Sequence, residues 1–302
     1  MFTQPLMATC WTTAGDAASD RTDLRSPLPL RDRVEAASRA GFSGFGLLSA
    51  DLPEAERAYG MTGIRSIFAD NGITHVELEG LPHWWGASGA ERAASEETRR
   101  LLLRAAEALG ARHIKVGPDG SGLPWDLGRW AAAFGQLAGE AAGCGARLGI
   151  EFLPWMNVAT VHDGLRLVEE AGHEGGGVII DSWHTERAGT PASELAAIPV
   201  ERIVGVELDD ADARMIGTMF EDTVHRRRYC GEGDLDLVGI ISALHGAGWR
   251  GPWGIEILSV EHRALDVATA SAKAFDTGYE VLSRVLDRPG ASGTRAARGA
   301  GS

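Results

Sequence analysis

The chain has few cysteines, few basic residues and no long apolar segment. Its 302 residues include three cysteines, Cys10, Cys144 and Cys230, which are far apart and form no CxxC pair. This odd, scattered set argues against a disulfide framework or a structural zinc site, so we expect a reducing, cytoplasmic environment. No run of 18 apolar residues occurs, which argues against a membrane-spanning helix. No basic segment followed by an apolar one occurs among the first residues, MFTQPLMATC, so we expect no signal peptide.

The shortage of basic residues also bears on the partners of the protein. There are 29 lysines and arginines against 42 aspartates and glutamates, which gives a formal net charge of −13. Binding to nucleic acid needs a basic face that neutralises phosphates, so we expect no nucleic-acid partner. The hydrophobic fraction of 44% is that of an ordinary globular protein with a sizeable core. The composition therefore suits a protein that acts on small molecules.

Short apolar segments and longer amphipathic segments alternate along the chain. Apolar runs of this kind are typical of strands covered on both faces in a parallel sheet. The eight predicted strands are Leu6–Thr12, Gly44–Leu48, Thr74–Leu78, His113–Val116, Leu148–Leu153, Val178–Asp181, Ile203–Leu208 and Trp253–Leu258. The predicted helices, several of which are followed by a glycine that can end them, are Leu30–Ala40, Glu91–Leu109, Trp130–Ala142, Val161–Ala171, Leu235–His245 and Val267–Leu286.

This alternation predicts an α/β fold, a single-domain (β/α)8 TIM barrel over residues 1–286. The remaining residues, 287–302, are rich in glycine, alanine and arginine without an apolar period, so we expect a disordered tail. The alternative is an open doubly wound sheet. Such a sheet usually carries a glycine-rich phosphate-binding motif after its first strand, and the segment Trp11–Gly15 does not supply one.

Four consecutive predicted strands carry a carboxylate among aliphatic residues: Glu151, Asp181, Glu207 and Glu256. In a barrel the strands end together at the face where the chemistry lies. Buried carboxylates that converge repel one another, and a divalent cation resolves that conflict. Oxygen ligands favour Mn²⁺ or Mg²⁺ over zinc, so we predict one such ion as the only cofactor. The alternative is that these acids merely end their strands and face solvent.

An ordered set of short motifs accompanies these carboxylates. They are GIE at Gly149–Glu151, IDSWH at Ile180–His184, VELDD at Val206–Asp210, RRYCGEGD at Arg227–Asp234 and GIE at Gly254–Glu256. The set resembles the sugar phosphate isomerase/epimerase superfamily, also called the xylose-isomerase-like TIM barrels. The resemblance covers the C-terminal half in detail and the N-terminal half only in its rhythm of strands and helices.

The resemblance implies a role for each of these residues. Glu151, Asp181, the position of Glu207, and Glu256 would bind one divalent metal, and Glu151 and Glu256 would also transfer protons. The family usually has histidine where this chain has Glu207. An all-carboxylate site could prefer another metal or bind metal weakly or not at all, and Asp209 is a substitute ligand.

Substrate contacts are expected from two sources. The resemblance implies that His184 and Arg227 orient substrate oxygens. Weaker candidates lie at or after the ends of predicted strands: Trp11, Glu79, His83 and Trp155. The tryptophans are included because aromatic faces suit sugar rings. Lys115, within the fourth strand, could reach the pocket or extend outward.

We therefore expect a metal-dependent isomerase or epimerase that removes a proton beside the carbonyl of a keto-sugar or polyol. The first alternative is a lyase or dehydratase acting on 3-keto-glycosides, similar to C-glycoside deglycosidases, for which the resemblance implies a small β-rich partner subunit. The second is a non-catalytic binding barrel with a degenerate metal site. An abasic-site endonuclease shares the fold but needs a basic groove and further histidine ligands, which the sequence lacks. The expected partners are a small carbohydrate-like substrate and a second copy of the chain, without membrane contact.

Overall fold

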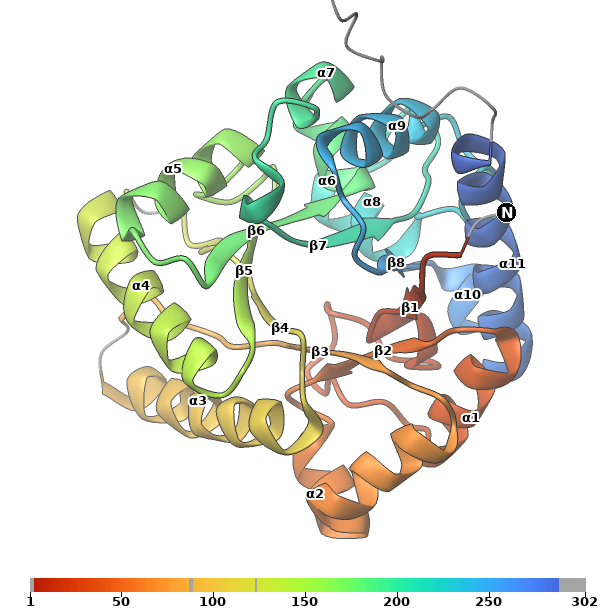
Figure 1. Cartoon of the computed structure of the whole chain (residues 1–302), viewed down its shortest axis with the longest axis horizontal. Helices are drawn as coiled ribbons and strands as arrows, with labels where there is room; N and C mark the ends of the chain where they lie inside the picture. Colours follow the sequence, from red (N-terminus) through yellow and green to blue (C-terminus); the bar gives the residue numbers. More distant parts are fainter. Residues whose placement is uncertain (1–2, 87–88, 123, 288–302) are drawn as a thin grey trace, which may run out of the picture.

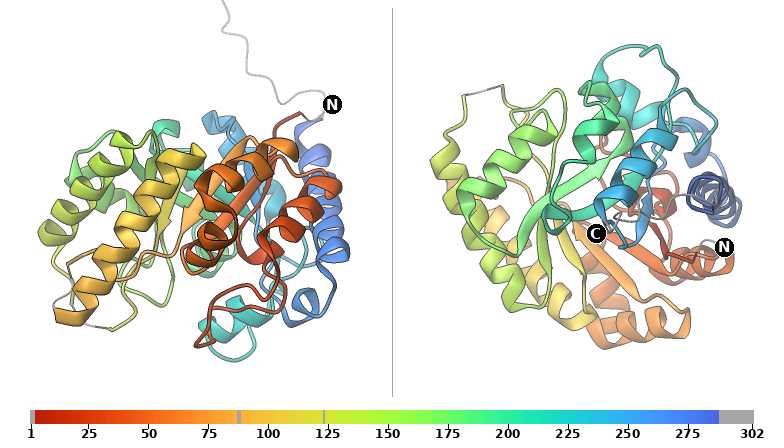
Figure 2. Two further views of the ribbon diagram at one scale, coloured as in Figure 1. Left: turned by 90° about the horizontal axis from the view of Figure 1, so that it is seen from below. Right: turned by 45° about the horizontal axis from the view of Figure 1, so that its top comes forward.

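Eight parallel strands close into a barrel in their sequence order, which confirms the predicted fold. The structure, a computed structural model, describes residues 3–86, 89–122 and 124–287. The strands are β1 (Leu6–Ala8), β2 (Gly44–Leu48), β3 (His75–Glu79), β4 (His113–Val116), β5 (Arg147–Glu151), β6 (Gly176–Asp181), β7 (Ile203–Leu208) and β8 (Trp253–Ile255). They lie at the centre of Figure 1, and the helices surround them in all three views (Figures 1 and 2).

The outer layer consists of helices that follow the strands. The longer ones are α1 (Leu30–Ala40), α2 (Leu52–Asp70), α3 (Gly89–Leu109), α4 (Leu127–Gly143), α5 (Val161–Ala171), α9 (Leu237–Ala247) and α11 (Val267–Leu286). The shorter ones are η1 (Trp11–Thr13), α6 (Ser182–Arg187), α7 (Ala192–Leu195), η2 (Val200–Arg202), α8 (Met219–His225) and α10 (Val260–Arg263). None of the described helices is long and apolar enough to cross a membrane.

The structure corrects several predicted boundaries. The first strand ends at Ala8, because the chain turns into the 3₁₀ helix η1, and the last strand ends at Ile255. Helix α2 was not among the predicted helices; Gly60 interrupts it with φ +63° and ψ 161°. The predicted tail lies outside the described residues from position 288 onward.

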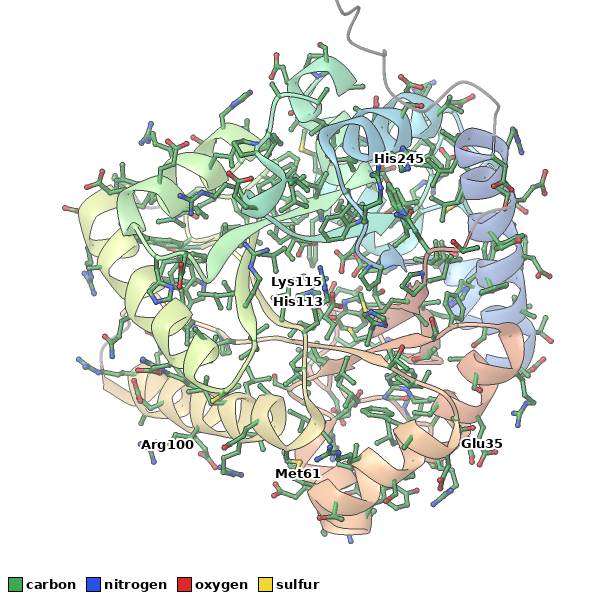
Figure 3. All side chains as sticks on the ribbon, in the orientation of Figure 1. Glu35, Met61, Arg100, His113, Lys115 and His245 are labelled. Atoms are coloured by element: carbon green, nitrogen blue, oxygen red, sulfur yellow. The ribbon has the colours of Figure 1, made fainter. Side chains whose placement is uncertain are left out.

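The inside of the barrel is charged, whereas the layer between strands and helices is apolar. Lys115 on β4 contacts Glu207 on β7, and because these strands are not neighbours, the contact crosses the barrel interior. His113 lies one inward position earlier on β4, with Nε2 2.7 Å from Glu77 Oε2. Figure 3 places His113 and Lys115 in the middle of the ring of helices.

Glycines make room for these long polar side chains. A Cβ at Gly254 would lie 3.1 Å from Cγ of Glu207, and a Cβ at Gly205 would lie 3.2 Å from Nε2 of His113. Both contacts are tighter than ordinary van der Waals distance. The small inward positions on β7 and β8 therefore allow a charged interior.

Candidate active site

Four carboxylates meet at the C-terminal ends of β5 to β8. One oxygen atom of each lies within 4.8 Å of an oxygen of every other, and the four residues are those that the sequence pointed to: Glu151, Asp181, Glu207 and Glu256. The register pairs Asp181 with Glu207, and Glu207 with Gly254, which sets the last three side by side. Asp181 and Glu207 are fully buried, Glu256 is nearly so, and Glu151 is partly exposed.

Lys115 lies within this carboxylate cluster. Its Nζ donates to Glu207 Oε1 at 2.8 Å and Oε2 at 3.0 Å, and to Glu256 Oε1 at 3.1 Å. The ammonium is also 3.0 Å from Glu79 Oε2 and 3.8 Å from Glu151 Oε1. Burial favours the neutral amine, but the charges of these carboxylates outweigh it and raise the pKa of Lys115 well above its ordinary value. Lys115 is therefore a permanent internal cation of the site.

Arg227 supplies the second internal cation. Its Nη1 donates to Asp181 Oδ2 at 2.7 Å, to Glu256 Oε2 at 3.0 Å and to Asp209 Oδ2. Its Nη2 lies 3.3 Å from Nε2 of His184. The resemblance implied that this arginine orients substrate; in the structure the guanidinium also ties together carboxylates from three strand ends.

Asp209 bonds to Arg227 and to the Ser182 hydroxyl, which lies 2.7 Å from Asp209 Oδ1. Its side chain is fully buried beyond the end of β7. Asp209 is not one of the residues whose oxygens meet in the four-carboxylate cluster. It therefore fits a partner of Arg227 better than a substitute metal ligand.

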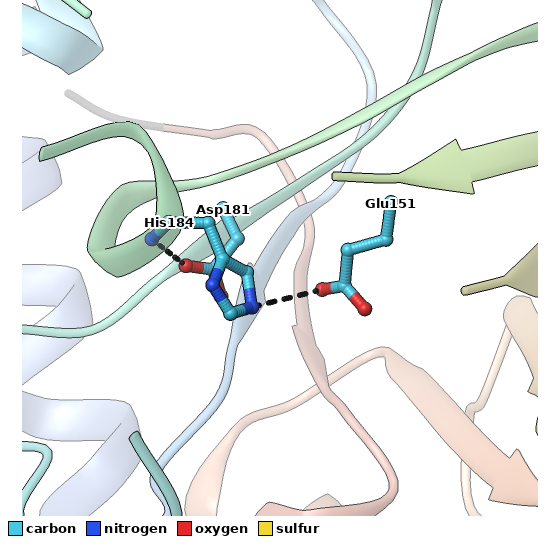
Figure 4. Close-up of side chains that lie close together, drawn as sticks. All are labelled: Glu151, Asp181 and His184. Carbon is cyan, nitrogen blue, oxygen red and sulfur yellow. Dashed lines mark hydrogen bonds and ion pairs between the residues drawn. The ribbon is translucent and has the colours of Figure 1, made fainter. Parts of the chain in front are cut away.

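His184 reaches the cluster because helix α6 begins directly after β6. Asp181 caps that helix, since its Oδ1 accepts the backbone N–H of His184 at 2.8 Å. The imidazole Nε2 then lies 3.7 Å from Glu151 Oε1 (Figure 4). Burial, with the nearby charge of Arg227, lowers the pKa of His184 well below its ordinary value. A neutral imidazole at this place can accept or donate a hydrogen bond to a substrate oxygen.

Burial also changes the acidity of the cluster. It raises the pKa of Glu151 to about 8, with Lys115 opposing the shift and Glu256 adding to it. It raises the pKa of Glu79 to about 6, again against the charge of Lys115. For Glu207, burial and the charge of Glu256 act to raise the pKa, whereas the ammonium of Lys115 on both of its oxygens acts to lower it and favours the carboxylate. Crowded carboxylates of this kind are typical of sites that transfer protons or bind cations.

A cavity of about 290 Å³ opens onto the cluster. Its polar wall comprises Glu79, Lys115, Glu151, His184, Arg227 and Glu256. Trp11 and Trp155 also line it, together with Leu153 and Met156. Asp181 and Glu207 are not among the described residues of this wall.

His83 lies in the wall of a second, largely apolar cavity of about 650 Å³. Leu153 and Met156 line both cavities, so the two are neighbours. Most of the second wall is apolar, and includes Leu48, Leu81 and Trp85. The structure thus places His83 apart from the other predicted substrate contacts.

The cluster fits a divalent cation. Six carboxylates contact or surround the two internal cations: Glu79, Glu151, Asp181, Glu207, Asp209 and Glu256. The formal charge of the buried group is thus strongly negative. Two oxygens of this set, Glu79 Oε1 and Glu151 Oε1, are buried and accept no hydrogen bond in the described part of the chain. Two overlapping sets of residues could hold such an ion: Glu151, Asp181, Glu207 and Glu256, or Glu151, Asp181 and His184.

Sequence reasoning did not identify the contact between Lys115 and Glu207 or the bridging role of Arg227. A lysine within the apolar strand HIKV was the available signal for the first. Its partner could not be read from the pattern, because the contact spans 92 positions and crosses the barrel.

Parallel eight-stranded barrels with acidic side chains at the ends of β5 to β8 form one class of TIM barrel, and comparison with known proteins agrees. The profile of the xylose isomerase-like TIM barrel family matches residues 34–284, and the chain belongs to that family.

Two curated relatives and one solved structure illustrate the similarity. A 3-dehydroshikimate dehydratase of Pseudomonas aeruginosa is 28% identical over 252 residues, which cover 82% of this chain but only 38% of that relative. An inosose isomerase of Halalkalibacterium halodurans is 22% identical over 258 residues, which cover 83% of this chain and 90% of that relative. The crystal structure of an IolI protein with a bound zinc atom superposes with a TM-score of 0.81 at 19% identity, covering 94% of this chain and 100% of the other.

Proposed function

We propose that the protein is an enzyme that removes a proton from the carbon beside the carbonyl of a small polyhydroxylated ketone, and that it works as an isomerase or epimerase. The observation that carries this proposal is the cavity wall, where Glu151 and Glu256 stand beside Lys115, Arg227 and His184. Proton removal beside a carbonyl needs a base and positive charge near the oxygen that becomes negative. The substrates in the names of the two relatives, 3-dehydroshikimate and inosose, are both cyclic polyhydroxylated ketones.

Each side chain has a defined task in this proposal. Glu151 and Glu256 hold and move the proton at their carboxylate oxygens, from either side of the bound carbon. His184 and Arg227 orient the hydroxyl and carbonyl oxygens of the substrate. Trp11 and Trp155 cover its ring and exclude water.

A divalent ion, for which the oxygen ligands favour Mn²⁺ or Mg²⁺, belongs to this proposal. Glu151, Asp181 and Glu256 would hold it, with Glu207 as the fourth candidate. Such an ion would supply positive charge to the carbonyl and hydroxyl oxygens of the substrate.

The test is proton exchange in D₂O. The protein with Mn²⁺ is incubated with 3-dehydroshikimate, an inosose and a ketohexose, and NMR follows deuterium incorporation beside the carbonyl. We expect exchange into one of these ketones together with an epimeric or isomeric product. The absence of exchange with all of them, in protein that binds Mn²⁺ and is folded, contradicts the proposal.

The apolar cavity supports a second candidate, a lyase or dehydratase that uses the same proton removal to expel a group. A cavity of about 650 Å³ beside the charged one offers space for an apolar leaving group, such as the aglycone of a 3-keto-glycoside. Release of aglycone from such a substrate, without epimerisation of the ketones, would favour this candidate, and a small partner subunit would then be sought. Dehydration of 3-dehydroshikimate would equally favour the lyase class.

A further inference from the structure

Asp181 and Glu256 give their two oxygens to different donors, whereas Glu207 gives both of its oxygens to a single donor. Both of them accept from the single ammonium of Lys115, at 2.8 and 3.0 Å. Glu207 is fully buried, and its hydrogen bonds within the described chain go to this lysine. If Glu207 gave up these hydrogen bonds to bind a metal ion, the buried ammonium of Lys115 would lose its nearest counterion, which is unfavourable.

The other three carboxylates remain better placed for a metal ion. Glu151 has a buried oxygen that accepts no hydrogen bond in the described residues. Asp181 and Glu256 each give one oxygen to Arg227, at 2.7 and 3.0 Å. Their other oxygens accept from the backbone N–H of His184 at 2.8 Å and from Lys115 at 3.1 Å, so each carboxylate serves donors on different elements. Three carboxylates at the ends of β5, β6 and β8 are sufficient protein ligands for Mn²⁺ or Mg²⁺, which commonly keep water and substrate oxygens in their remaining positions.

The cavity separates the two members of the pair. Lys115 lines the wall, together with Glu151 and Glu256, whereas Glu207 is not among the lining residues. Glu207 reaches Lys115 from the opposite strand, through the space that Gly254 leaves beside its Cγ. The ammonium of Lys115 can therefore contact a molecule in the cavity, and the carboxylate of Glu207 binds this ammonium outside the cavity wall.

We propose that Glu207 is the counterion of Lys115 and not a metal ligand, and that Lys115 is a further catalytic residue whose ammonium binds the carbonyl oxygen of the substrate and the enediolate oxygen formed from it. The role of Lys115 rests on the proposed function, whereas the assignment of Glu207 does not. The divalent ion would then be held by Glu151, Asp181 and Glu256. Glu207, at the position where the family usually has histidine, would instead bind the ammonium of Lys115, which is a second cation of the site.

The first test is a double-mutant cycle in thermal unfolding, with Lys115→Met, Glu207→Leu and the double variant, each in EDTA and in about 1 mM MnCl₂. Lys115→Met leaves the buried Glu207 without its hydrogen-bond donor, and Glu207→Leu removes the nearest of the carboxylates around Lys115, so we expect Tm to fall by about 6 °C or more in each single variant. The double variant replaces the pair with apolar side chains and should recover most of that loss. If the fall in Tm of the double variant equals the sum of the falls of the two single variants, the two side chains do not interact and the pairing is overturned.

Mn²⁺ then distinguishes a counterion from a ligand. We expect the Mn²⁺-induced rise in Tm of the double variant to equal that of the wild type, and Asp181→Asn to abolish it. Loss of the rise in the double variant as well would show that Glu207 is a ligand and overturn the assignment. If the wild type shows no rise, the metal of the proposed function is refuted, while the cycle in EDTA still decides the pairing.

The second test concerns the contact of Lys115 with substrate. On the ketone that the wild type turns over, the double variant should bind Mn²⁺ normally and lose at least about 100-fold in kcat, since it lacks one charge that stabilises the enediolate. A kcat within tenfold of wild type overturns the catalytic role. If the wild type turns over none of the ketones, the proposed function and this role fail together, and the assignment of Glu207 still stands or falls by the unfolding experiments.

Discussion

Glu256 is the carboxylate of the cluster that contacts both internal cations, Lys115 at 3.1 Å and Arg227 at 3.0 Å, and it also lines the cavity. We predict that Glu256→Gln lowers turnover by about 10²–10⁴-fold, because the amide cannot accept a proton. Stability should be kept or raised, since the cluster holds an excess of negative charge. Glu261→Gln is the control, because that side chain is 82% exposed and lies outside the cavity wall. Steady-state kinetics that place E256Q within tenfold of the control would contradict the proton-transfer role.

Arg227 and Arg226 are adjacent, yet only the first is buried. Arg227 neutralises Asp181, Asp209 and Glu256, so Arg227→Met leaves the two buried aspartates without their cation and Glu256 with Lys115 alone. We predict a loss of about 3–5 kcal/mol in the free energy of unfolding, measured with urea. Arg226→Met, on an exposed side chain, should change it by less than about 0.5 kcal/mol. Similar effects of the two variants would show that the guanidinium does not hold the strand ends together.

The interior glycines can be tested in the same way. In Gly254→Ala the new Cβ would lie 2.9 Å from the Val206 carbonyl oxygen and 3.1 Å from Glu207 Cγ. We predict a loss of about 1–3 kcal/mol in unfolding free energy, as for other overpacked cores. Gly246→Ala is the matched control, because its Cβ would meet nothing within 4 Å on helix α9, where alanine favours helix formation. Equal Tm values for both variants would mean that the interior has room that the structure does not indicate.

At the scale of elements, the strands could be predicted from the sequence because several of them are local apolar runs and they alternate with amphipathic segments. The helices Leu30–Ala40, Val161–Ala171 and Val267–Leu286 were predicted to the residue, since a cap or a glycine marks their ends. Helix α2 was missed because Gly60, with its left-handed φ, breaks the apolar period. Strand ends at residues 8 and 255 could not be located, because apolar residues continue beyond them into the loops.

The short helix α10 is joined to the rest of the barrel by a buried histidine. His262 Nε2 lies 2.8 Å from the Thr12 carbonyl oxygen, and Nδ1 lies 2.9 Å from the Tyr229 hydroxyl. The neutral ring satisfies both contacts by donating to the first and accepting from the second. Burial lowers the pKa of His262 to about 4, from an ordinary value of 6.5.

This shift predicts a pH dependence of stability. The unfolded chain takes up a proton at His262 below pH 6.5, whereas the folded chain does so only near pH 4. Stability is therefore complete above pH 6.5 and falls by about 3 kcal/mol as the pH drops to 4. His262→Gln, which can keep both hydrogen bonds, should lack this part of the loss in urea titrations at several pH values. If the free energy of unfolding of H262Q depends on pH in the same way as that of the wild type, His262 is not the source of this loss.

At the scale of the whole molecule, the location of the candidate site at the strand ends could be predicted from the sequence. The ion pairs inside the barrel could not. Glu151, Asp181 and Glu256 could be predicted because each ends its own strand, and a barrel gathers strand ends. The contact of Lys115 with Glu207 depends on the closure of the ring and on glycines that shape its interior. The excess of acids is therefore distributed unevenly: the buried cluster holds six carboxylates and two cations, and the remaining excess lies elsewhere in the chain.

These two groups of charges should respond differently to salt. Exposed charges of a chain with net charge −13 repel one another, and raising NaCl from about 0.01 to 0.15 M shortens the screening length from about 30 to 8 Å. We predict that Tm of the wild type rises by about 2–4 °C over this range, which corresponds to roughly 1 kcal/mol. Lys115→Met/Glu207→Leu has the same net charge and removes only buried charges, which salt screens little, so its rise should match. A clearly smaller rise in the double variant, measured by thermal unfolding, would mean that solvent ions reach the interior of the barrel and that the pair is not buried in solution.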